Sequence, residues 1–339
     1  MIFVQLAYAG MALSSKASIS KGMNPYVFVA YRQAFATLAL APFAYFFDRK
    51  KTEPLSYRLI LKIFLISLFG ITLSLNLYTY AINYVSATFA SASINTIPAL
   101  TFLIAVAFRI ESFSVKDFPG IMKFVGSVIS LSGALVFAFV KGPKLNFMNR
   151  SNAIYNTNNI ITHFTTKEKS IQGCLLMLSA NTAWSSWIVM QASLVKQYPA
   201  KIRLTMLQCL FSCVQSTVWA MIMDRDKSAW TLNWDLNLFS VAYCGIVVTG
   251  ISYWLQLWVV ENKGPLFAVT FTPLALIFTA IFSAFLWKEI LYLGSICGGI
   301  LLVGGLYCVI WGKNKEEANN IIQKLCDDAK EETNVITTV

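Results

Sequence analysis

The amino-acid sequence predicts an all-α membrane protein with ten transmembrane helices, arranged as two inverted five-helix repeats. Three observations lead to this prediction. The composition is too apolar for a water-soluble chain, ten apolar stretches are each long enough to cross a bilayer, and the two halves of the chain match each other. Together they indicate that lipid, and not water, surrounds most of the protein.

The composition supports a membrane location directly. Of the 339 residues, 57% are hydrophobic and only 13% are charged, whereas about 25% of the residues in a typical soluble domain are charged. The net charge of +11 does not indicate nucleic-acid binding, because the basic residues form short clusters between long apolar runs. Such clusters are typical of loops beside anionic lipid headgroups.

Ten apolar stretches are candidates for transmembrane helices, since a span needs about 20 mostly apolar residues. Five lie in each half of the chain, with a long polar stretch between the two sets. In chain order they are residues 2–19, 26–47, 59–82, 86–108, 121–140, 171–195, 204–223, 238–260, 266–287 and 290–311.

The domain organisation follows from these stretches. Residues 1–140 are predicted to form the first five-helix repeat and residues 171–312 the second. Residues 141–170 between them are rich in Asn, Ser and Thr, a composition typical of a flexible loop. The tail, residues 313–339, carries charges of both signs and is predicted to be a cytoplasmic amphipathic helix or a disordered end.

The basic residues in the short loops predict the orientation, because Lys and Arg are more frequent on the cytoplasmic side. With the N-terminus in the cytoplasm, the inner loops hold twelve of them and the outer loops hold five. Both termini are therefore predicted to be cytoplasmic, in the plasma membrane or another cell membrane such as the vacuolar one. The inner set is Arg49, Lys50, Lys51, Arg58, Lys62, Arg109, Lys116, Lys123, Lys196, Lys201, Arg203 and Lys263, and the outer set is Lys16, Lys21, Arg225, Lys227 and Lys288.

The two halves match at nearly constant offsets, which indicates a duplication. Because each half has an odd number of spans, the second half must cross the membrane in the opposite sense. Inverted repeats are typical of secondary transporters, whose substrate site lies near the bilayer midplane between the halves. At a shift of 178 residues the identical pairs include Phe89 and Phe267, Thr101 and Thr279, Glu111 and Glu289, Gly120 and Gly298, and Gly126 and Gly304.

The sequence also resembles a known family. The opening stretch YAGMALSSKASISKGMNPYVFVAYRQAFATLALAPFAYFFDRK is similar to that of the plant WAT1-related, or nodulin-21-like, transporters of the drug/metabolite transporter superfamily. The likeness continues in SATFASASINTIPALTFLIAVAFRIE and in FTPLALIFTAIFSAFLWKEILYLGSICGGILLVGGLYCVIWGK. The resemblance implies two inverted EamA domains and the export or facilitated movement of amino acids, or in some members auxin.

One departure from this family concerns the third span. Several members have an acid–Gln–Asn sequence there, whereas this chain has Ser74-Leu75-Asn76. Proton-coupled carriers commonly use an Asp, Glu or His inside the membrane, and the acidic residues near the spans of this sequence lie at span ends. The sequence therefore predicts a facilitative carrier.

Polar side chains within a span are costly, and they usually face a cavity or another helix. Arg32 lies about a third of the way into the second span. Its planar guanidinium is suited to bind a substrate carboxylate, and the alternative is that it snorkels to the interface. The uncharged candidates for substrate binding, for which interhelical hydrogen bonds are the alternative, are Asn76, Asn95, Thr96, Gln256 and Thr272.

Trp184 and Trp254 are predicted to line the substrate path, with simple packing or an interfacial belt as the alternative. Small residues at the spacing of Gly294 and Gly298, and of Gly126 and Ser130, predict close helix packing, and a homodimer face is a second interpretation. No cofactor or metal site is predicted, because the seven cysteines lack ligand spacing and the one histidine lies in the long loop.

The predicted function is the transport of small metabolites, amino acids or auxin-like organic acids, by alternating access. The expected partners are a small-molecule substrate and the lipid bilayer. A nucleotide-sugar or drug carrier of the same superfamily is one alternative, and a non-transporting membrane receptor is another. An enzyme is not predicted, because the spans contain no nucleophile–base pair and no buried pair of carboxylates.

Overall fold

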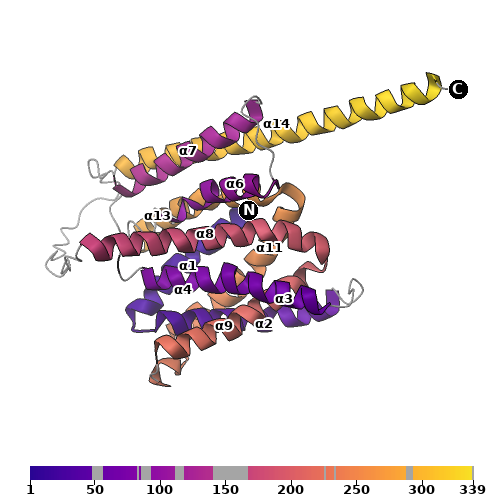
Figure 1. Ribbon diagram of the computed structural model, residues 1–339. Coiled ribbons are helices and arrows are strands. Elements are labelled where there is room, and N and C mark those ends of the chain that lie inside the picture. Colours follow the sequence, from indigo (N-terminus) through magenta and orange to yellow (C-terminus); the bar gives the residue numbers. More distant parts are fainter. Residues whose placement is uncertain are drawn as a thin grey trace.

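The computed structural model describes residues 1–47, 56–81, 84, 93–110, 118–139, 167–224, 227–232, 234–287 and 293–337, and all regular structure in these residues is helical. Ten helical rods lie side by side and correspond to the ten predicted spans (Figure 1). The first five rods are α1 (Ile2–Ser20), α2 (Pro25–Phe47), α3–η2–α4 (Tyr57–Ile66, Ser67–Thr72 and Leu73–Ala81), α6 (Ile97–Ala107) and α7 (Phe118–Phe139). The second five are α8 (Lys167–Gln197), α9 (Lys201–Met223), α10–η4–α11 (Leu236–Tyr243, Cys244–Ile251 and Ser252–Lys263), α12–α13 (Pro265–Thr270 and Thr272–Trp287) and α14 (Leu293–Thr337), with the short η3 (Lys227–Trp230) before α10.

Seven of the described rods are long and apolar enough to cross a membrane. They are α2, the rod from α3 to α4, α7, α9, the rod from α10 to α11, α12 with the first part of α13, and α14 between Cys297 and Glu316. α6 is equally apolar but has only 11 described residues. The predicted all-α membrane fold is therefore confirmed.

Side-chain burial has the pattern of a protein in lipid. Leu38 and Phe46 on α2 are 70% and 76% exposed, whereas Gln33 on the same helix is fully buried. Asn76 and Thr249 are also fully buried. Apolar side chains thus face outward and polar ones face the interior, because a polar group in lipid has no water to bind and must find partners in the protein.

Each rod of the first half and its equivalent rod in the second half, five places further along the chain, pack against equivalent neighbours. α2 packs on α9 and α7 packs on α14, so both pairs join equivalent rods of the two halves. α8 packs on α4 and α6 of the first half, and α1 packs on α10 and α13 of the second. An exchange of this kind is what a two-fold relation between two inverted five-helix repeats produces.

Four rods depart from regular α-helix at equivalent places. The third and eighth rods carry π-helical stretches, η2 and η4, in their middles. The fourth rod has a turn at 95–96 before α6, and the ninth has one at Phe271 between α12 and α13. Pro98 and Pro273 each lie two residues after such a turn, so they are structurally equivalent although they do not align at the shift of 178 residues. π-helical stretches and broken helices frequently mark functional sites in membrane proteins.

Glycines allow α7 and α14 to pack closely. A Cβ atom added at Gly126 would lie 2.8 Å from the carbonyl oxygen of Gly305, and one added at Gly133 would lie 3.1 Å from that of Gly298. The close helix packing predicted for Gly126 and Gly298 is confirmed, and it joins two helices of the same chain. This face is therefore covered within the molecule and gives no support to the homodimer interpretation.

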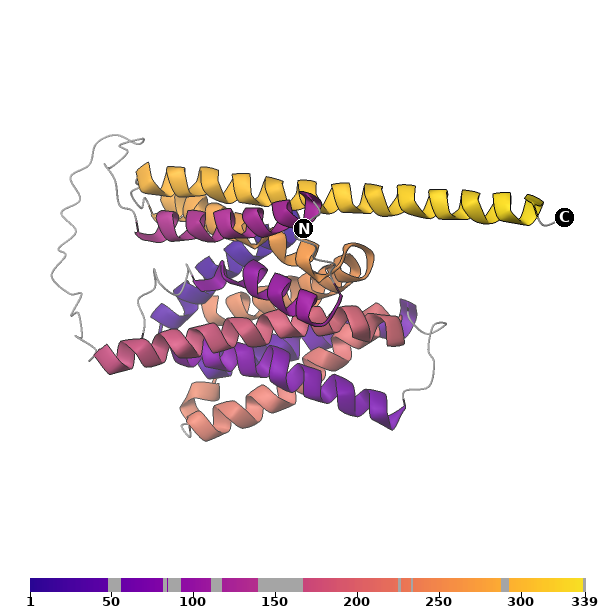
Figure 2. The same cartoon turned by 45° about the horizontal axis from the view of Figure 1, so that its top comes forward.

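Two helices extend beyond their predicted limits. α8 begins at Lys167, within the segment 141–170 that the sequence predicted as a loop. α14 continues past the bundle to Thr337 (Figures 1 and 2), so the described part of the tail is helical and not disordered. Lys and Glu are good helix formers, and a helix does not stop where the bilayer ends. The apolar run alone therefore underestimates helix length.

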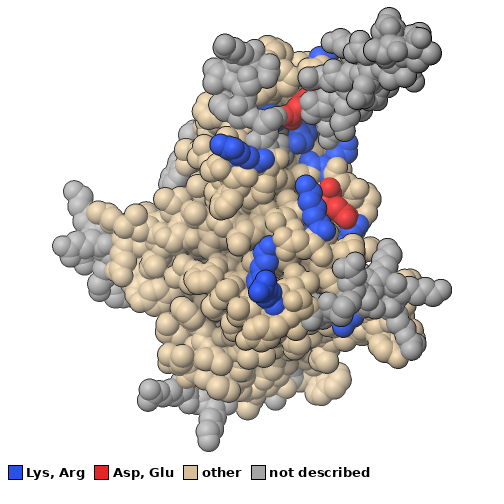
Figure 3. All heavy atoms as spheres, turned by 45° about the vertical axis from the view of Figure 1, so that its right-hand side comes forward, with Lys and Arg blue, Asp and Glu red and all other residues tan. Residues whose placement is uncertain are grey.

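Basic side chains gather at one end of the bundle (Figure 3). Lys62 Nζ donates to Gln197 Oε1 at 2.9 Å, which joins the start of α3 to the end of α8. Lys201 pairs with Glu261, which joins α9 to α11. The lysines and arginines described at this end of α3, α8 and α9 belong to the loops predicted to be cytoplasmic, and they are Arg58, Lys62, Lys196, Lys201 and Arg203. Of the residues in the orientation count, Arg49, Lys50, Lys51, Lys116, Arg225 and Lys288 lie outside the described residues.

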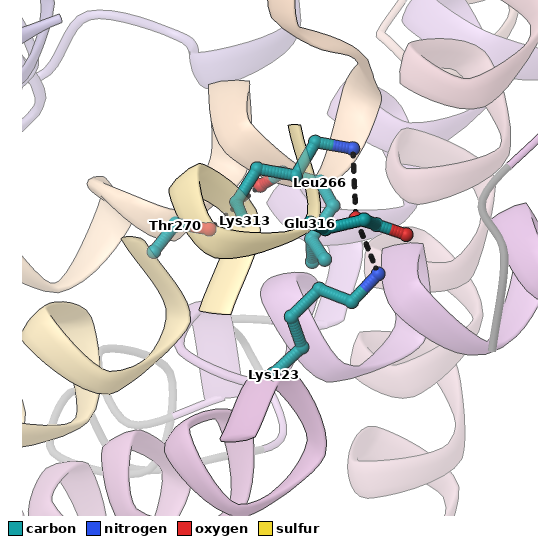
Figure 4. A network of polar contacts seen from close by, with 5 residues as sticks. All are labelled: Lys123, Leu266, Thr270, Lys313 and Glu316. Atoms are coloured by element: carbon teal, nitrogen blue, oxygen red, sulfur yellow. Dashed lines mark hydrogen bonds and ion pairs between the residues drawn. The ribbon is translucent and has the colours of Figure 1, made fainter. Parts of the chain in front are cut away.

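A buried ion pair at the same end connects α7 to α14. Lys123 has no exposed side-chain area, and its Nζ lies 2.9 Å from Glu316 Oε2, while Lys313 Nζ lies 3.8 Å from the same oxygen (Figure 4). Gly312 permits this approach, because a Cβ there would lie 2.9 Å from the carbonyl oxygen of Pro119. The pair neutralises a lysine that would otherwise be buried alone, and it fixes the point where α14 leaves the bundle.

Candidate functional site

Arg32 on α2 occupies the interior between α2 and the eighth rod, where it is only 5% exposed. Its Nε donates to Thr249 Oγ1 at 2.5 Å, and its Nη2 donates to the hydroxyl of Tyr253 at 3.1 Å. Both acceptors are neutral, and none of the ion pairs formed by the described residues includes Arg32. Because a guanidinium carries a positive charge, Arg32 places a charge in the interior that has no acidic partner among the described residues.

The π-helical stretch η4 and the first turn of α11 place the two acceptors beside Arg32. Thr249 and Tyr253 are four residues apart and lie on one face of the rod. Gly245 lies one turn earlier, and a Cβ there would lie 2.7 Å from the carbonyl oxygen of Arg32 and 2.5 Å from Phe35 Cβ. Only a glycine therefore allows η4 to approach α2 closely enough for these hydrogen bonds.

Two further polar groups lie beside the contact of Arg32 with Tyr253. The hydroxyl of Tyr8 on α1 is buried without a hydrogen bond to another described residue, and the fully buried amide of Gln33 on α2 lies beside the hydroxyl of Tyr253. Tyr8 lies within electrostatic range of Arg32 and Tyr253. An unpaired buried polar group costs about 1–3 kcal/mol. The guanidinium, hydroxyl and amide groups here are all donors to an anion.

Three aromatic rings pack together next to Tyr253. The ring centroids of Trp184 and Trp187 are 4.9 Å apart. The ring centroid of Tyr253 lies 5.6 Å from that of Trp184 and 5.2 Å from that of Trp187. Gly70 in η2 makes room for Trp187, since a Cβ there would lie 2.5 Å from the tryptophan Cβ. We call these three residues the aromatic triad. Its faces are suited to an aromatic ring or to a cation.

A small pocket whose lining includes several amide side chains lies beside Tyr253 and Trp187. Gln191 Nε2 on α8 donates to Gln208 Oε1 on α9 at 2.8 Å, and Gln208 Nε2 returns a bond to Gln191 Oε1 at 3.3 Å. Gln256 on α11 also lines this space, and its Oε1 is buried without a hydrogen bond from any other described residue. We call the space lined by Trp187, Ile188, Gln191, Thr205, Gln208, Tyr253, Gln256, Leu257 and Val260 the amide pocket.

On the third rod, Thr72 and Asn76 occupy the positions that correspond to Thr249 and Tyr253 on the eighth rod. Thr72 donates to Gln215 Oε1 on α9 at 2.8 Å, and Gln215 Nε2 donates to the carbonyl oxygen of Phe64 at 3.2 Å. Asn76 Nδ2 donates to the carbonyl oxygen of Thr72 at 2.8 Å, and Asn76 Oδ1 is buried without a hydrogen bond from other described residues. These bonds hold the third rod on α9.

α8 supports the interruption in the fourth rod. Asn181 Nδ2 donates to the carbonyl oxygen of Ser93 at 2.7 Å and lies 3.2 Å from Thr96 Oγ1. Ser185 Oγ, one turn further along α8, donates to the carbonyl oxygen of Ile97 at 3.3 Å. Backbone carbonyls freed by a break are thus satisfied by side chains of the neighbouring helix, as broken helices in membranes require.

The residues predicted for the site fall into three groups. Arg32, Trp184 and Gln256 lie around Tyr253, which contacts or neighbours all of them. Asn76 lies on the third rod, while Asn95 and Thr96 lie at the turn before α6, where Asn95 is 3% exposed. Thr272 at the start of α13 and Trp254 on α11 are half-buried, and no hydrogen bond or ring contact described for them reaches the group around Tyr253.

Sequence reasoning missed several polar residues that complete the site. They share a detectable signal, which is polar side chains one helical turn apart inside an apolar span, as with Thr249 and Tyr253 or with Asn181 and Ser185. The residues missed are Tyr8, Gln33, Asn181, Ser185, Gln191, Gln208 and Thr249. In the part of the chain that the structure describes, no three His, Cys, Asp or Glu side chains converge on a point that would suit a metal ion.

This fold, with a polar interior inside an apolar shell, defines a multi-pass membrane transporter. Residues 1–139 and 171–311 both match the EamA-like transporter family, and the chain belongs to this family, which is one of transporters and not of enzymes. The predicted resemblance to WAT1-related proteins is confirmed by relatives in Arabidopsis thaliana. WAT1-related protein At1g43650 is 55% identical over 317 residues, which is 94% of this chain and 91% of the relative.

Two other comparisons agree with this assignment. WAT1-related protein At5g64700 of Arabidopsis thaliana is 45% identical over 340 residues, which is 98% of this chain and 94% of the relative. A protein of known crystal structure superposes with a TM-score of 0.70 over 93% of this chain and 96% of its own, at 13% sequence identity. The first comparison supports the family, and the second supports the fold alone.

Proposed function

We propose that the protein carries a small metabolite with a carboxylate, an amino acid or an auxin-like organic acid, through the membrane by alternating access. The single observation that carries this proposal is the buried guanidinium of Arg32, whose described partners are only the neutral hydroxyls of Thr249 and Tyr253. A carboxylate supplies the missing negative charge and accepts two parallel hydrogen bonds from a guanidinium. Tyr8 and Gln33 add donors on the same side.

The architecture supports alternating access as the mechanism. The amide pocket has room for about one water-sized group, so a whole metabolite needs the two halves to separate on one side of the membrane. The paired rods α2 and α9, and the broken fourth and ninth rods, lie between the halves. Movement of one repeat against the other around a central site is the usual mode of transport for inverted repeats.

We expect transport to proceed without a proton gradient. Position 74, where several members of the family have an acidic residue, is a serine, and a serine hydroxyl does not carry protons in transport. Purified protein in liposomes should therefore exchange labelled for unlabelled carboxylate substrate when no ion gradient is imposed. Imposing a pH gradient should not cause accumulation of a substrate whose charge is constant over that range. Accumulation driven by the pH gradient alone would contradict the facilitative mechanism.

We expect both termini on the cytoplasmic side. The described basic side chains at one end of the bundle belong to the loops with the larger count of Lys and Arg, and such an excess is typical of the cytoplasmic face. A fluorescent or protease-accessible tag after Val339 should report the cytoplasm, and a tag inserted between Phe139 and Lys167 should report the opposite side. Two tags on the same side would contradict an arrangement of five spans in each half.

A further inference from the structure

Two residues of the amide pocket differ from its other polar groups, because Gln256 Oε1 and Trp187 Nε1 are buried without a hydrogen bond to another described residue. Gln191 and Gln208 bind each other through two reciprocal hydrogen bonds, and Thr205 Oγ1 donates to the carbonyl oxygen of Lys201 at 2.9 Å. Gln256 is 5% exposed, and its Oε1 has no hydrogen-bond donor among the described residues. The pocket therefore contains one buried carbonyl oxygen that remains available as an acceptor.

The surroundings of this oxygen favour a donor that carries positive charge. The rings of Trp187 and Tyr253 line the same pocket, and aromatic faces attract cations. The lining contains amide and hydroxyl groups and the indole N–H of Trp187, and it contains no basic side chain. The space admits about one water-sized group, and a protonated amine is of that size.

The amide pocket and the Arg32 site share one residue. Tyr253 accepts the hydrogen bond from Arg32 through its hydroxyl, and its side chain also forms part of the pocket wall. Gln256 follows Tyr253 by three residues in α11, so both side chains lie on the same face of that helix. A molecule bound beside Tyr253 is thus close to a cationic donor on one side and to a carbonyl acceptor on the other.

We infer that Gln256 forms a second binding subsite, which takes a protonated amine or another N–H donor of the substrate. This inference rests on the proposed function, in which Arg32 binds the carboxylate. A zwitterion satisfies both subsites, because its carboxylate faces the guanidinium and its amine faces the carbonyl oxygen and the aromatic rings. Gln256 then determines how strongly the carrier prefers an amino acid to the acid without the amine.

The test compares tryptophan with indole-3-propanoate, which differ only in the amine. Initial rates of exchange are measured in liposomes containing the full chain. Gln256→Met keeps the size of the side chain but removes the acceptor, and it should lower the ratio of tryptophan to indole-3-propanoate transport by about tenfold or more, since sites built for a hydrogen bond discriminate strongly. Gln256→Glu keeps an acceptor and should preserve or raise that ratio.

Gln215→Met is the matched control, because this glutamine is buried but has both amide atoms paired, with Thr72 and with Phe64. It should lower thermal stability in detergent and reduce both rates alike. A ratio that stays within about threefold in Gln256→Met, the size of an average interhelical hydrogen bond, would overturn the inference. So would a wild-type protein that carries indole-3-propanoate but not tryptophan. Transport of neither compound by the wild type would overturn the carboxylate proposal as well.

Discussion

Arg32→Met is expected to abolish transport while leaving the protein at least as stable as the wild type. The charged side chain is buried with only neutral described partners, and a charged residue at the centre of a transmembrane helix costs about 2.5–3.5 kcal/mol on insertion scales. Replacing such a charge with an apolar side chain of similar size is therefore neutral or stabilising. Loss of the guanidinium, however, removes the bidentate contact to a carboxylate.

The expected loss in exchange rate is about 100-fold or more, the equivalent of about 3 kcal/mol for a charge-assisted hydrogen bond to a buried group. Arg32→Lys keeps the charge but not the planar fork, and it should retain partial activity with weaker apparent affinity. The measurements are initial rates in liposomes and the thermal midpoint of the purified protein in detergent.

The combination of stability and activity separates two roles for Arg32. If the residue serves only to hold α2 against η4, Arg32→Met lowers the thermal midpoint and the rate together. If it binds substrate, the midpoint stays or rises while the rate falls. Lys196→Met at the exposed end of α8 is the control for loss of a positive charge, and it should change neither quantity.

The two halves share one framework but present different chemistry on it. At offsets of 176 and 177 residues, Arg32 corresponds to Gln208, Thr249 to Thr72, and Tyr253 to Asn76. Arg32 donates to one hydroxyl on η4 and to another on α11, whereas Gln208 on α9 binds an amide on α8. The interior is therefore positive on one side and neutral on the other, which suits a substrate with unlike ends.

The sequence predicted the spans and their inversion because hydropathy and repeat spacing depend on local composition. It also identified Arg32, Asn76 and Gln256 as unusual, since each is polar within an apolar run. The partners of these residues could not be predicted in the same way. Whether Gln256 or Gln208 retains an unpaired oxygen depends on which helices meet, and that is decided by close approaches at Gly70 and Gly245.

The ends of the helices were harder to predict than their existence. Hydropathy falls where the bilayer ends, but the hydrogen-bond ladder of α14 continues through Lys313 and Glu316 to Thr337. The burial of Lys123 was also unexpected, because it depends on Glu316, which lies 193 residues away in the chain. Long-range pairs of this kind have no local signal in the sequence.

Gly305→Val is expected to destabilise the fold strongly, while Gly304→Val, one residue earlier on α14, is expected to have little effect. A Cβ at Gly305 would lie 2.6 Å from the backbone nitrogen of Ser130 and 2.7 Å from the carbonyl oxygen of Gly126. These are backbone atoms, so relief requires α7 and α14 to separate along their contact. At Gly304 a Cβ meets no atom within 4 Å, because this position faces outward.

Overpacking of a tight contact costs about 1–3 kcal/mol, occasionally more, and the upper end applies here because both obstructing atoms belong to a helix backbone. The thermal midpoint of purified Gly305→Val should therefore fall by several degrees, with lower yield of folded protein, whereas that of Gly304→Val should stay close to the wild type. Because the two variants carry the same side chain on adjacent residues, helix propensity and hydrophobicity are matched. An equal effect at both positions would show that α14 packs through a different face, and a larger effect at Gly304 would place that face against another copy of the chain.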